Sequence, residues 1–111
     1  IFSAVDALLY PTYQLGARGA IAAILTAAPG PSVKLWNAVI AQNWDTARDL
    51  HERLMPLWDA IGLDNMPSLV KYAQQLQGLD AGHARRPTSP ATDLQKRAVR
   101  AALDNLGLIT K

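Results

Sequence analysis

The sequence contains no cysteine, and this absence removes several classes of site at once. Disulfide bridges, thiolate metal sites and a cysteine nucleophile are excluded, and the lack of cysteine agrees with a reducing cytoplasm. Glutamate is nearly absent too, because Glu52 is the only one. The aspartates are scattered, and Asp45 and Asp49 fit a solvated helix face better than a carboxylate pair for acid–base catalysis.

Long hydrophobic runs and a strong charge imbalance are also lacking. No apolar run approaches the ~20 residues of a membrane-spanning helix, and no signal peptide is visible. The net charge of +2 is too small to indicate a nucleic-acid or acidic-lipid partner. Because 50% of the residues are hydrophobic and 18% are charged, we expect one packed domain of a cytoplasmic protein, without membrane or nucleic-acid binding.

Few residues could carry chemistry. His51 and His83 have no companions at metal-ligand spacing, so we expect no metal site. Residues 16–19 lack the third glycine of a dinucleotide fingerprint and the ending of a phosphate loop, which favours a simple turn and no cofactor. A Schiff-base lysine must be desolvated or lie near another cation. The sequence shows neither for Lys71, so a lysine on a helix surface is the favoured interpretation.

The first part of the chain predicts a helix between two strands. Residues 1–3 read as the end of a buried strand. Asp6 is expected to cap a helix that runs to about Leu15, with Gly16 in the left-handed position after it. Residues 19–25 are almost continuously apolar, as in a parallel strand covered on both faces. A buried helical segment fits the same period, but the flanking glycines favour a strand.

The middle of the chain predicts amphipathic helices. Apolar residues recur at helical spacing from residue 31 to about residue 42. Asn43 is expected to cap the next helix, and Pro67 to begin another that ends at Gly78. The predicted inward faces of these two helices comprise Ala47, Leu50, Leu54, Leu57, Trp58 and Ile61, and then Leu69, Val70, Ala73 and Leu76.

A loop over residues 79–87 leads to the last predicted helix. Ser89 is expected to cap this helix, with Pro90 in the first helical position, where its missing N–H costs nothing. Gly107 is expected to end it. The residues predicted to face inward are Leu94, Ala98, Ala101, Ala102 and Leu106.

Several short motifs occur in the order found in the dihydrodipicolinate synthase and N-acetylneuraminate lyase family. Residues 3–6, Ser-Ala-Val-Asp, stand where the family has Ser-Gly-Asp-Asp. Residues 14–21 resemble its Leu-Gly-x-x-Gly-x-Ile motif, and residues 65–71 resemble its Asn-Pro-x-x-x-Lys motif. Residues 43–57 and 86–90 are similar to its Gly-Asp-Phe…Leu-x-Pro-Leu and Arg-x-Pro…Pro segments. The chain thus resembles the last third of a family member.

This resemblance implies an α/β fold, a (β/α)8 TIM barrel. Residues 1–42 would be its last two βα units, with strands seven and eight, and residues 43–111 a helical C-terminal extension, so the chain itself would be mostly α. The resemblance also implies a class I aldolase, lyase or synthase that forms a Schiff base with pyruvate or another 2-oxo acid. The family's lysine and tyrosine lie upstream of Ile1, so no catalytic residue is expected in this chain, and the chain alone would be inactive.

The substrate-binding residues implied by the resemblance are Ala4, Val5 and Ile21. Ala4 and Val5 would line the mouth of the pocket, and the backbone of Ile21 would approach the 2-oxo acid, at the carboxyl ends of barrel strands. Val5 replaces an acidic residue, which favours a less polar acceptor such as an aromatic aldehyde and hence the hydratase-aldolase branch, which cleaves arylidene-pyruvates. Other departures are Ala22 for serine and Thr26 for asparagine.

The implied partners are a 2-oxo acid, the N-terminal part of the barrel, and further copies in a dimer or tetramer. A second hypothesis stays open at this point. The many helices lined by alanine and leucine also fit a self-contained helical interaction module without an active site.

Overall fold

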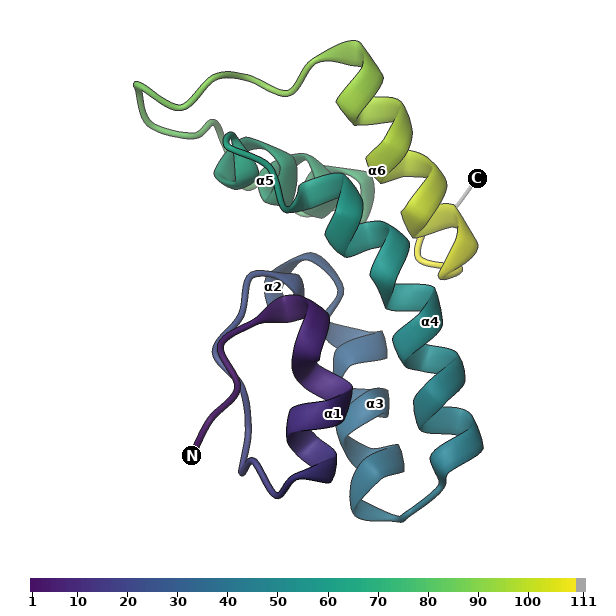
Figure 1. Cartoon of the computed structure of the whole chain (residues 1–111). Helices are drawn as coiled ribbons and strands as arrows, with labels where there is room; N and C mark the ends of the chain where they lie inside the picture. Colours follow the sequence, from purple (N-terminus) through teal and green to yellow (C-terminus); the bar gives the residue numbers. More distant parts are fainter. Residues whose placement is uncertain (110–111) are drawn as a thin grey trace.

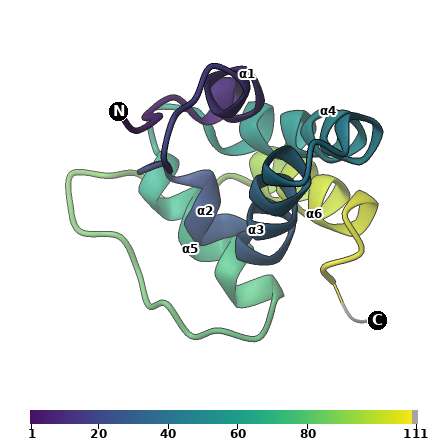
Figure 2. The same ribbon diagram turned by 90° about the horizontal axis from the view of Figure 1, so that it is seen from below.

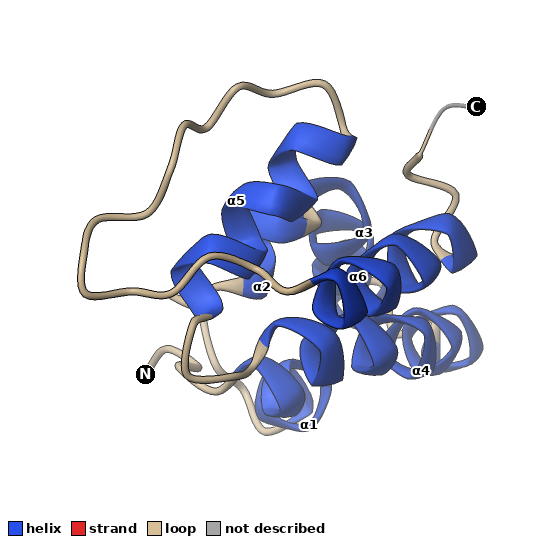
Figure 3. Cartoon of the chain, turned by 90° about the horizontal axis from the view of Figure 1, so that it is seen from above, coloured by secondary structure: helices blue, strands red, loops and turns tan. Residues whose placement is uncertain are grey.

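A computed structural model describes residues 1–109 of the chain as a set of helices joined by loops (Figure 3). The longest helix, α4, rises from the lower end of the molecule toward α5 (Figure 1). Beside its first half lie α1 and α3, and beside its second half lies α6. In chain order the elements are the 3-10 helix η1 (Asp6–Leu8), α1 (Leu9–Gln14), α2 (Ile24–Ala27), α3 (Pro29–Ile40), α4 (Trp44–Ile61), α5 (Met66–Leu76) and α6 (Asp93–Asn105).

One apolar core joins these helices, because each α-helix contributes at least one large side chain that is fully buried. These residues alternate with polar ones at helical spacing, so each helix buries one stripe and leaves the opposite face in water. The largest of them are Leu9, Ile24, Leu35, Leu57, Ile61, Leu69, Val99 and Leu103.

The predicted strand over residues 19–25 is mostly wrong. Ser3 and Ala20 form an isolated parallel bridge, and the same run of residues then turns into helix α2 at Ile24. Ile21 is 74% exposed, so this part is not covered on both faces. A ladder grows only where neighbouring strands supply partners, and between residues 1 and 109 these two short segments have only each other to pair with. The parallel direction of the pairing agrees with the prediction.

The predicted helix after Asp6 is present, but it starts differently. The 3-10 turn η1 precedes α1, and the Asp6 side chain makes no capping bond at the start of either helix. Its carboxylate instead accepts a hydrogen bond from the Ile24 backbone N–H at 2.6 Å, a contact across 18 residues that local sequence cannot reveal. Gly16 has a φ of +95°, which confirms the left-handed end of α1.

The middle helices agree well with the sequence patterns. Asn43 caps α4, since its Oδ1 accepts a hydrogen bond from the Thr46 backbone N–H at 3.4 Å. The predicted stripe of α4 is buried except for Trp58, which is half-buried. On α5, Leu69 and Ala73 are buried, whereas Val70 and Leu76 pack at the margin of the core. Gly78 follows α5 with a φ of +90°.

The last helix begins later than predicted. Thr92 caps α6 through a capping box: its Oγ1 accepts from the Gln95 N–H at 3.2 Å, and the Gln95 Oε1 accepts from the Thr92 N–H at 2.9 Å. The predicted cap at Ser89 and first position at Pro90 are therefore wrong, because this reciprocal pair satisfies two backbone donors where Ser89 would satisfy one. Gly107 has a positive φ of 71° after the helix.

The inward face of α6 differs from the prediction accordingly. Ala102 and Leu106 are buried as expected, but Leu94 is 70% exposed. Ala98 and Ala101 are exposed too. The buried residues Val99, Ala102, Leu103 and Leu106 follow the i, i+3, i+4, i+7 spacing of the face that meets α4 and α5.

We expect Thr92→Ala to destabilise the start of α6 by about 1 kcal/mol, the typical cost of losing a helix cap. Amide hydrogen exchange in the first turns of α6 would measure this loss as about fivefold faster exchange. Ser89→Ala is the matched control and should leave exchange nearly unchanged. Equal effects of the two substitutions would show that Thr92 is not the effective cap.

Candidate functional site

Ala4, Val5 and Ile21, singled out from the sequence, lie together at the carboxyl ends of two parallel segments. The Ser3 backbone N–H donates to the Gly19 carbonyl, and the Ile21 N–H donates to the Ser3 carbonyl, both at 2.9 Å. Val5 is 50% exposed and Ile21 74% exposed, and Ala4 is exposed as well. The structure thus brings the three residues to one edge, where they form an open surface.

The same edge holds two features that sequence reasoning missed. The Asp6 carboxylate binds the Ile24 N–H just beyond Val5. The Ser3 side chain is buried, and its Oγ has no hydrogen-bond partner among the described residues. A buried polar group without a partner is costly, so a partner from outside residues 1–109 would stabilise this edge. No local sequence signal marks either feature, because both depend on long-range packing.

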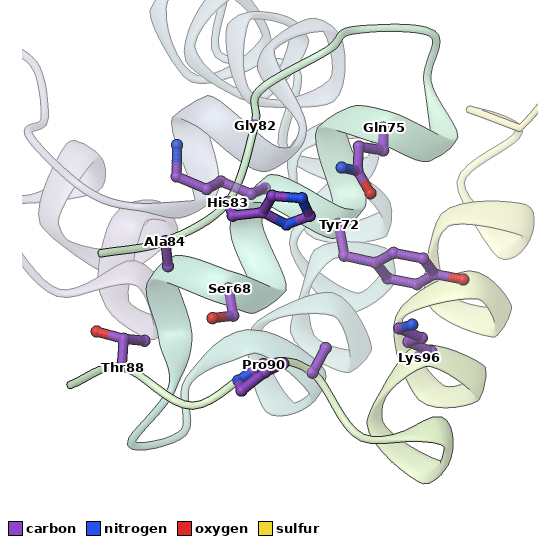
Figure 4. A pocket seen from close by; sticks show the side chains of 11 residues that line it. Ser68, Tyr72, Gln75, Gly82, His83, Ala84, Thr88, Pro90 and Lys96 are labelled. Carbon is purple, nitrogen blue, oxygen red and sulfur yellow. The ribbon is translucent and has the colours of Figure 1, made fainter. Parts of the chain in front are cut away.

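A cavity of about 290 Å³ lies elsewhere, between α5, the segment from residue 79 to residue 92, and the start of α6. Figure 2 shows this segment running around the outside of the helices. In Figure 4, Tyr72 extends from α5 toward Lys96, and His83 lies over α5. The residues that line the cavity are Ser68, Lys71, Tyr72, Gln75, Gly82, His83, Ala84, Thr88, Pro90, Ala91 and Lys96.

Three polar side chains of this cavity contact other groups of the protein. The Lys71 ammonium donates to the Ala81 carbonyl at 2.7 Å, and the Ser68 hydroxyl donates to the Ser89 carbonyl at 2.7 Å. The Lys96 ammonium lies 5.5 Å from the centre of the Tyr72 ring, within reach of a cation–π contact. These contacts fasten the long segment to α5 and place α6 beside it. Lys71 is therefore a helix lysine that holds a loop, in agreement with its sequence interpretation.

The remaining candidates do not gather into a site. Within residues 1–109, no cluster of three or more His, Cys, Asp or Glu side chains could hold a metal ion. The His51 ring lies 5.4 Å from the Tyr10 ring, and His83 lies in the loop of the cavity. Burial raises the pKa of Tyr13, whose ring packs edge-on against Trp36 at 4.9 Å, so Tyr13 is protonated at neutral pH and serves packing. None of the helices described has the length and apolar character needed to cross a membrane.

Comparisons with curated proteins find synthases that are much longer than this chain. The 4-hydroxy-tetrahydrodipicolinate synthase of Archaeoglobus fulgidus is 34% identical over 110 residues, which cover 99% of the chain and 38% of that protein. The synthase of Methanosarcina mazei is 33% identical over 109 residues, 98% of the chain and 38% of that protein. The chain therefore spans about 38% of the length of the curated relatives that it matches.

Solved structures of dihydrodipicolinate synthases share the fold of this chain. The enzyme from Thermotoga maritima superposes with a TM-score of 0.87 at 28% identity, over 97% of this chain and 37% of its own. The enzyme from Aquifex aeolicus gives 0.84 at 25% identity, over 99% of this chain and 38% of its own. The model of the dihydrodipicolinate synthetase family matches residues 1–106. This match covers nearly all of the chain, which belongs to the dihydrodipicolinate synthetase family.

Proposed function

We propose that this chain is the C-terminal portion of an enzyme that forms a Schiff base with pyruvate or another 2-oxo acid and then makes or cleaves a carbon–carbon bond. The observation that carries the proposal is the family match over residues 1–106. The share of 38% of the relatives' length supports a longer polypeptide, because the rest of such an enzyme has to lie outside this chain.

The proposed architecture is the end of a (β/α)8 barrel. Residues 1–42 are its last two βα units, and residues 43–111 are a helical extension. The parallel bridge between Ser3 and Ala20, with α1 on the connection between them, is the arrangement expected of a βαβ unit. The unpartnered Ser3 hydroxyl supports the same proposal, and so do the exposed apolar side chains in the two paired segments and next to them, Ile1, Phe2, Val5 and Ile21. Neighbouring strands of a closed barrel would cover them.

In this proposal the chain supplies part of the pocket but none of the reacting groups. The lysine that forms the Schiff base and the tyrosine that relays protons belong to the part of the barrel before Ile1. Ala4 and Val5 line the mouth of the pocket, and the backbone of Ile21 faces the 2-oxo acid. All three lie at the carboxyl ends of the paired segments, where barrel enzymes place their active sites. The covalent iminium supplies the electron sink, so the reaction needs no cofactor.

The acceptor we propose is an aromatic aldehyde, as in a hydratase-aldolase. Val5 supports this assignment, because an apolar side chain stands where the family pattern has an acid, and burial against an aromatic ring favours an apolar neighbour. The curated relatives are 4-hydroxy-tetrahydrodipicolinate synthases, so their acceptor is the competing assignment. We further propose a cytoplasmic homo-oligomer, a dimer or a tetramer.

Borohydride trapping tests the proposed function. The longer polypeptide, incubated with pyruvate and borohydride, should gain one stable adduct by intact mass, whereas residues 1–111 alone should gain none. A longer polypeptide that traps no 2-oxo acid would refute the catalytic proposal. The competing hypothesis, a helical module, predicts instead that the isolated chain is a monomer with one sharp thermal transition.

A further inference from the structure

The Asp6 carboxylate joins the two segments of the proposed site beyond the point where their backbones part. Backbone hydrogen bonds link residues 1–3 to residues 18–21, and the last of them runs from the Ile21 N–H to the Ser3 carbonyl. Beyond it the two segments diverge into η1 and α2. The bond from the Ile24 N–H to Asp6 Oδ2, at 2.6 Å, ties them together again.

Val5 therefore lies between the two ties, and Ile21 takes part in the first of them. Val5 directly precedes Asp6 in sequence, and Ile21 stands three positions before Ile24. Without the carboxylate, the last hydrogen bond between the two segments before Val5 would be the one from the Ile21 N–H to the Ser3 carbonyl. A positioning contact of this kind matters, because displacements of about 1 Å can cost up to about a hundredfold in rate.

The tie is a hydrogen bond to a carboxylate side chain rather than an ion pair. The salt bridges among the described residues are Arg48–Glu52 and Arg53–Asp49, and Asp6 is in neither. A hydrogen bond that involves an ionised acceptor is shorter and stronger than a neutral one. The Ile24 nitrogen and Asp6 Oδ2 are 2.6 Å apart, which is a close contact for an N–H donor. Asp6 is partly buried, which limits competition from water.

We propose that Asp6 is a positioning residue for the 2-oxo acid site: its carboxylate sets the separation between Val5 and the backbone of Ile21. This inference rests on the proposed function. It assigns a role to a side chain that touches no reacting atom and acts through the two residues that it holds in place.

Trapping at graded pyruvate concentrations, in the longer polypeptide, tests this role. Asp6→Ala should raise the half-saturating pyruvate concentration about tenfold, the loss expected for one hydrogen bond to a charged group. The maximal trapped fraction should stay that of wild type, because the reacting lysine is untouched. Asp6→Asn keeps an acceptor oxygen of lower strength, so its half-saturating concentration should rise only about two- to threefold. A purely structural role would lower the maximal fraction and the thermal stability instead, with no change in half-saturation.

Asp80→Ala is the matched control, because the Asp80 Oδ1 also accepts from a backbone N–H, that of Gly82 at 3.2 Å, in the exposed loop. It should leave half-saturation unchanged. An unchanged value for Asp6→Ala would overturn the inference and leave the proposed function standing. If Asp6→Ala does not fold, Asp6→Asn serves as the test. A half-saturating pyruvate concentration equal to that of wild type in this variant would overturn the inference. A wild-type polypeptide that does not trap would refute the proposed function itself.

Discussion

Replacing Leu57 with alanine is expected to destabilise the helical core by about 3 kcal/mol, the middle of the range for buried leucine truncations. Leu57 lies on α4 and is 0% exposed. Because Leu57 lies in the second half of α4, which packs against α6, a cavity here weakens the packing between these two helices. Amide hydrogen exchange in α4 and α6 should accelerate by about a hundredfold, since every 1.4 kcal/mol corresponds to a factor of ten.

Leu94→Ala provides the control for this measurement. Leu94 was predicted to face inward, yet it is 70% exposed on α6, so its truncation should change exchange by less than threefold, about 0.5 kcal/mol. If Leu57→Ala and Leu94→Ala accelerated amide exchange equally, the placement of α6 would be contradicted.

Replacing Val5 with aspartate is expected to lower kcat/KM for an aromatic aldehyde acceptor by about tenfold or more in the longer polypeptide. A carboxylate beside an apolar ring loses water without gaining a partner, and this penalty falls on the bound acceptor. For an acceptor with a cationic or strongly polar group, kcat/KM should fall less. Steady-state kinetics with the two acceptors would measure the ratio of the two kcat/KM values in each variant.

Val5→Asn is the matched control, since asparagine has nearly the size of aspartate without its charge. On a logarithmic scale, we expect asparagine to lower kcat/KM for the aromatic acceptor by no more than about half as much as aspartate does. The reason is that a neutral amide is less costly to desolvate than a carboxylate. If the aspartate variant equals the valine protein toward the aromatic acceptor, Val5 does not select the acceptor and the aromatic assignment is wrong.

The helices that could be predicted well are those whose ends carry local signals. Asn43 and Gly78 mark boundaries through side-chain caps and a positive φ, which depend only on neighbours in sequence. The start of α6 was misplaced because Ser89-Pro90 and Thr92 offer competing local signals. The reciprocal hydrogen bonds between Thr92 and Gln95 decide between them. Because the start of the helix was misplaced, its inward face was predicted wrongly too.

The candidate site shows where local reasoning stops. Residues 19–25 are apolar enough for either a strand or a buried helix, and the structure has one isolated bridge at Ala20 and the start of helix α2 at Ile24. The choice depends on whether neighbouring strands are present to continue the pairing. The hydrogen bond between Asp6 and Ile24 and the burial of the Ser3 hydroxyl both result from tertiary packing. No spacing in the sequence therefore indicates them. The positions of Ala4, Val5 and Ile21 came from the family resemblance alone.

Peptide mapping of the borohydride-trapped longer polypeptide tests the central claim most directly. The lysine that attacks the 2-oxo acid should lie outside residues 1–111, and Lys71 should remain unmodified because it holds the Ala81 carbonyl on the surface of α5. One modified lysine in a peptide upstream of Ile1 is the predicted result. An adduct on Lys71, or on any other lysine of this chain, would contradict it.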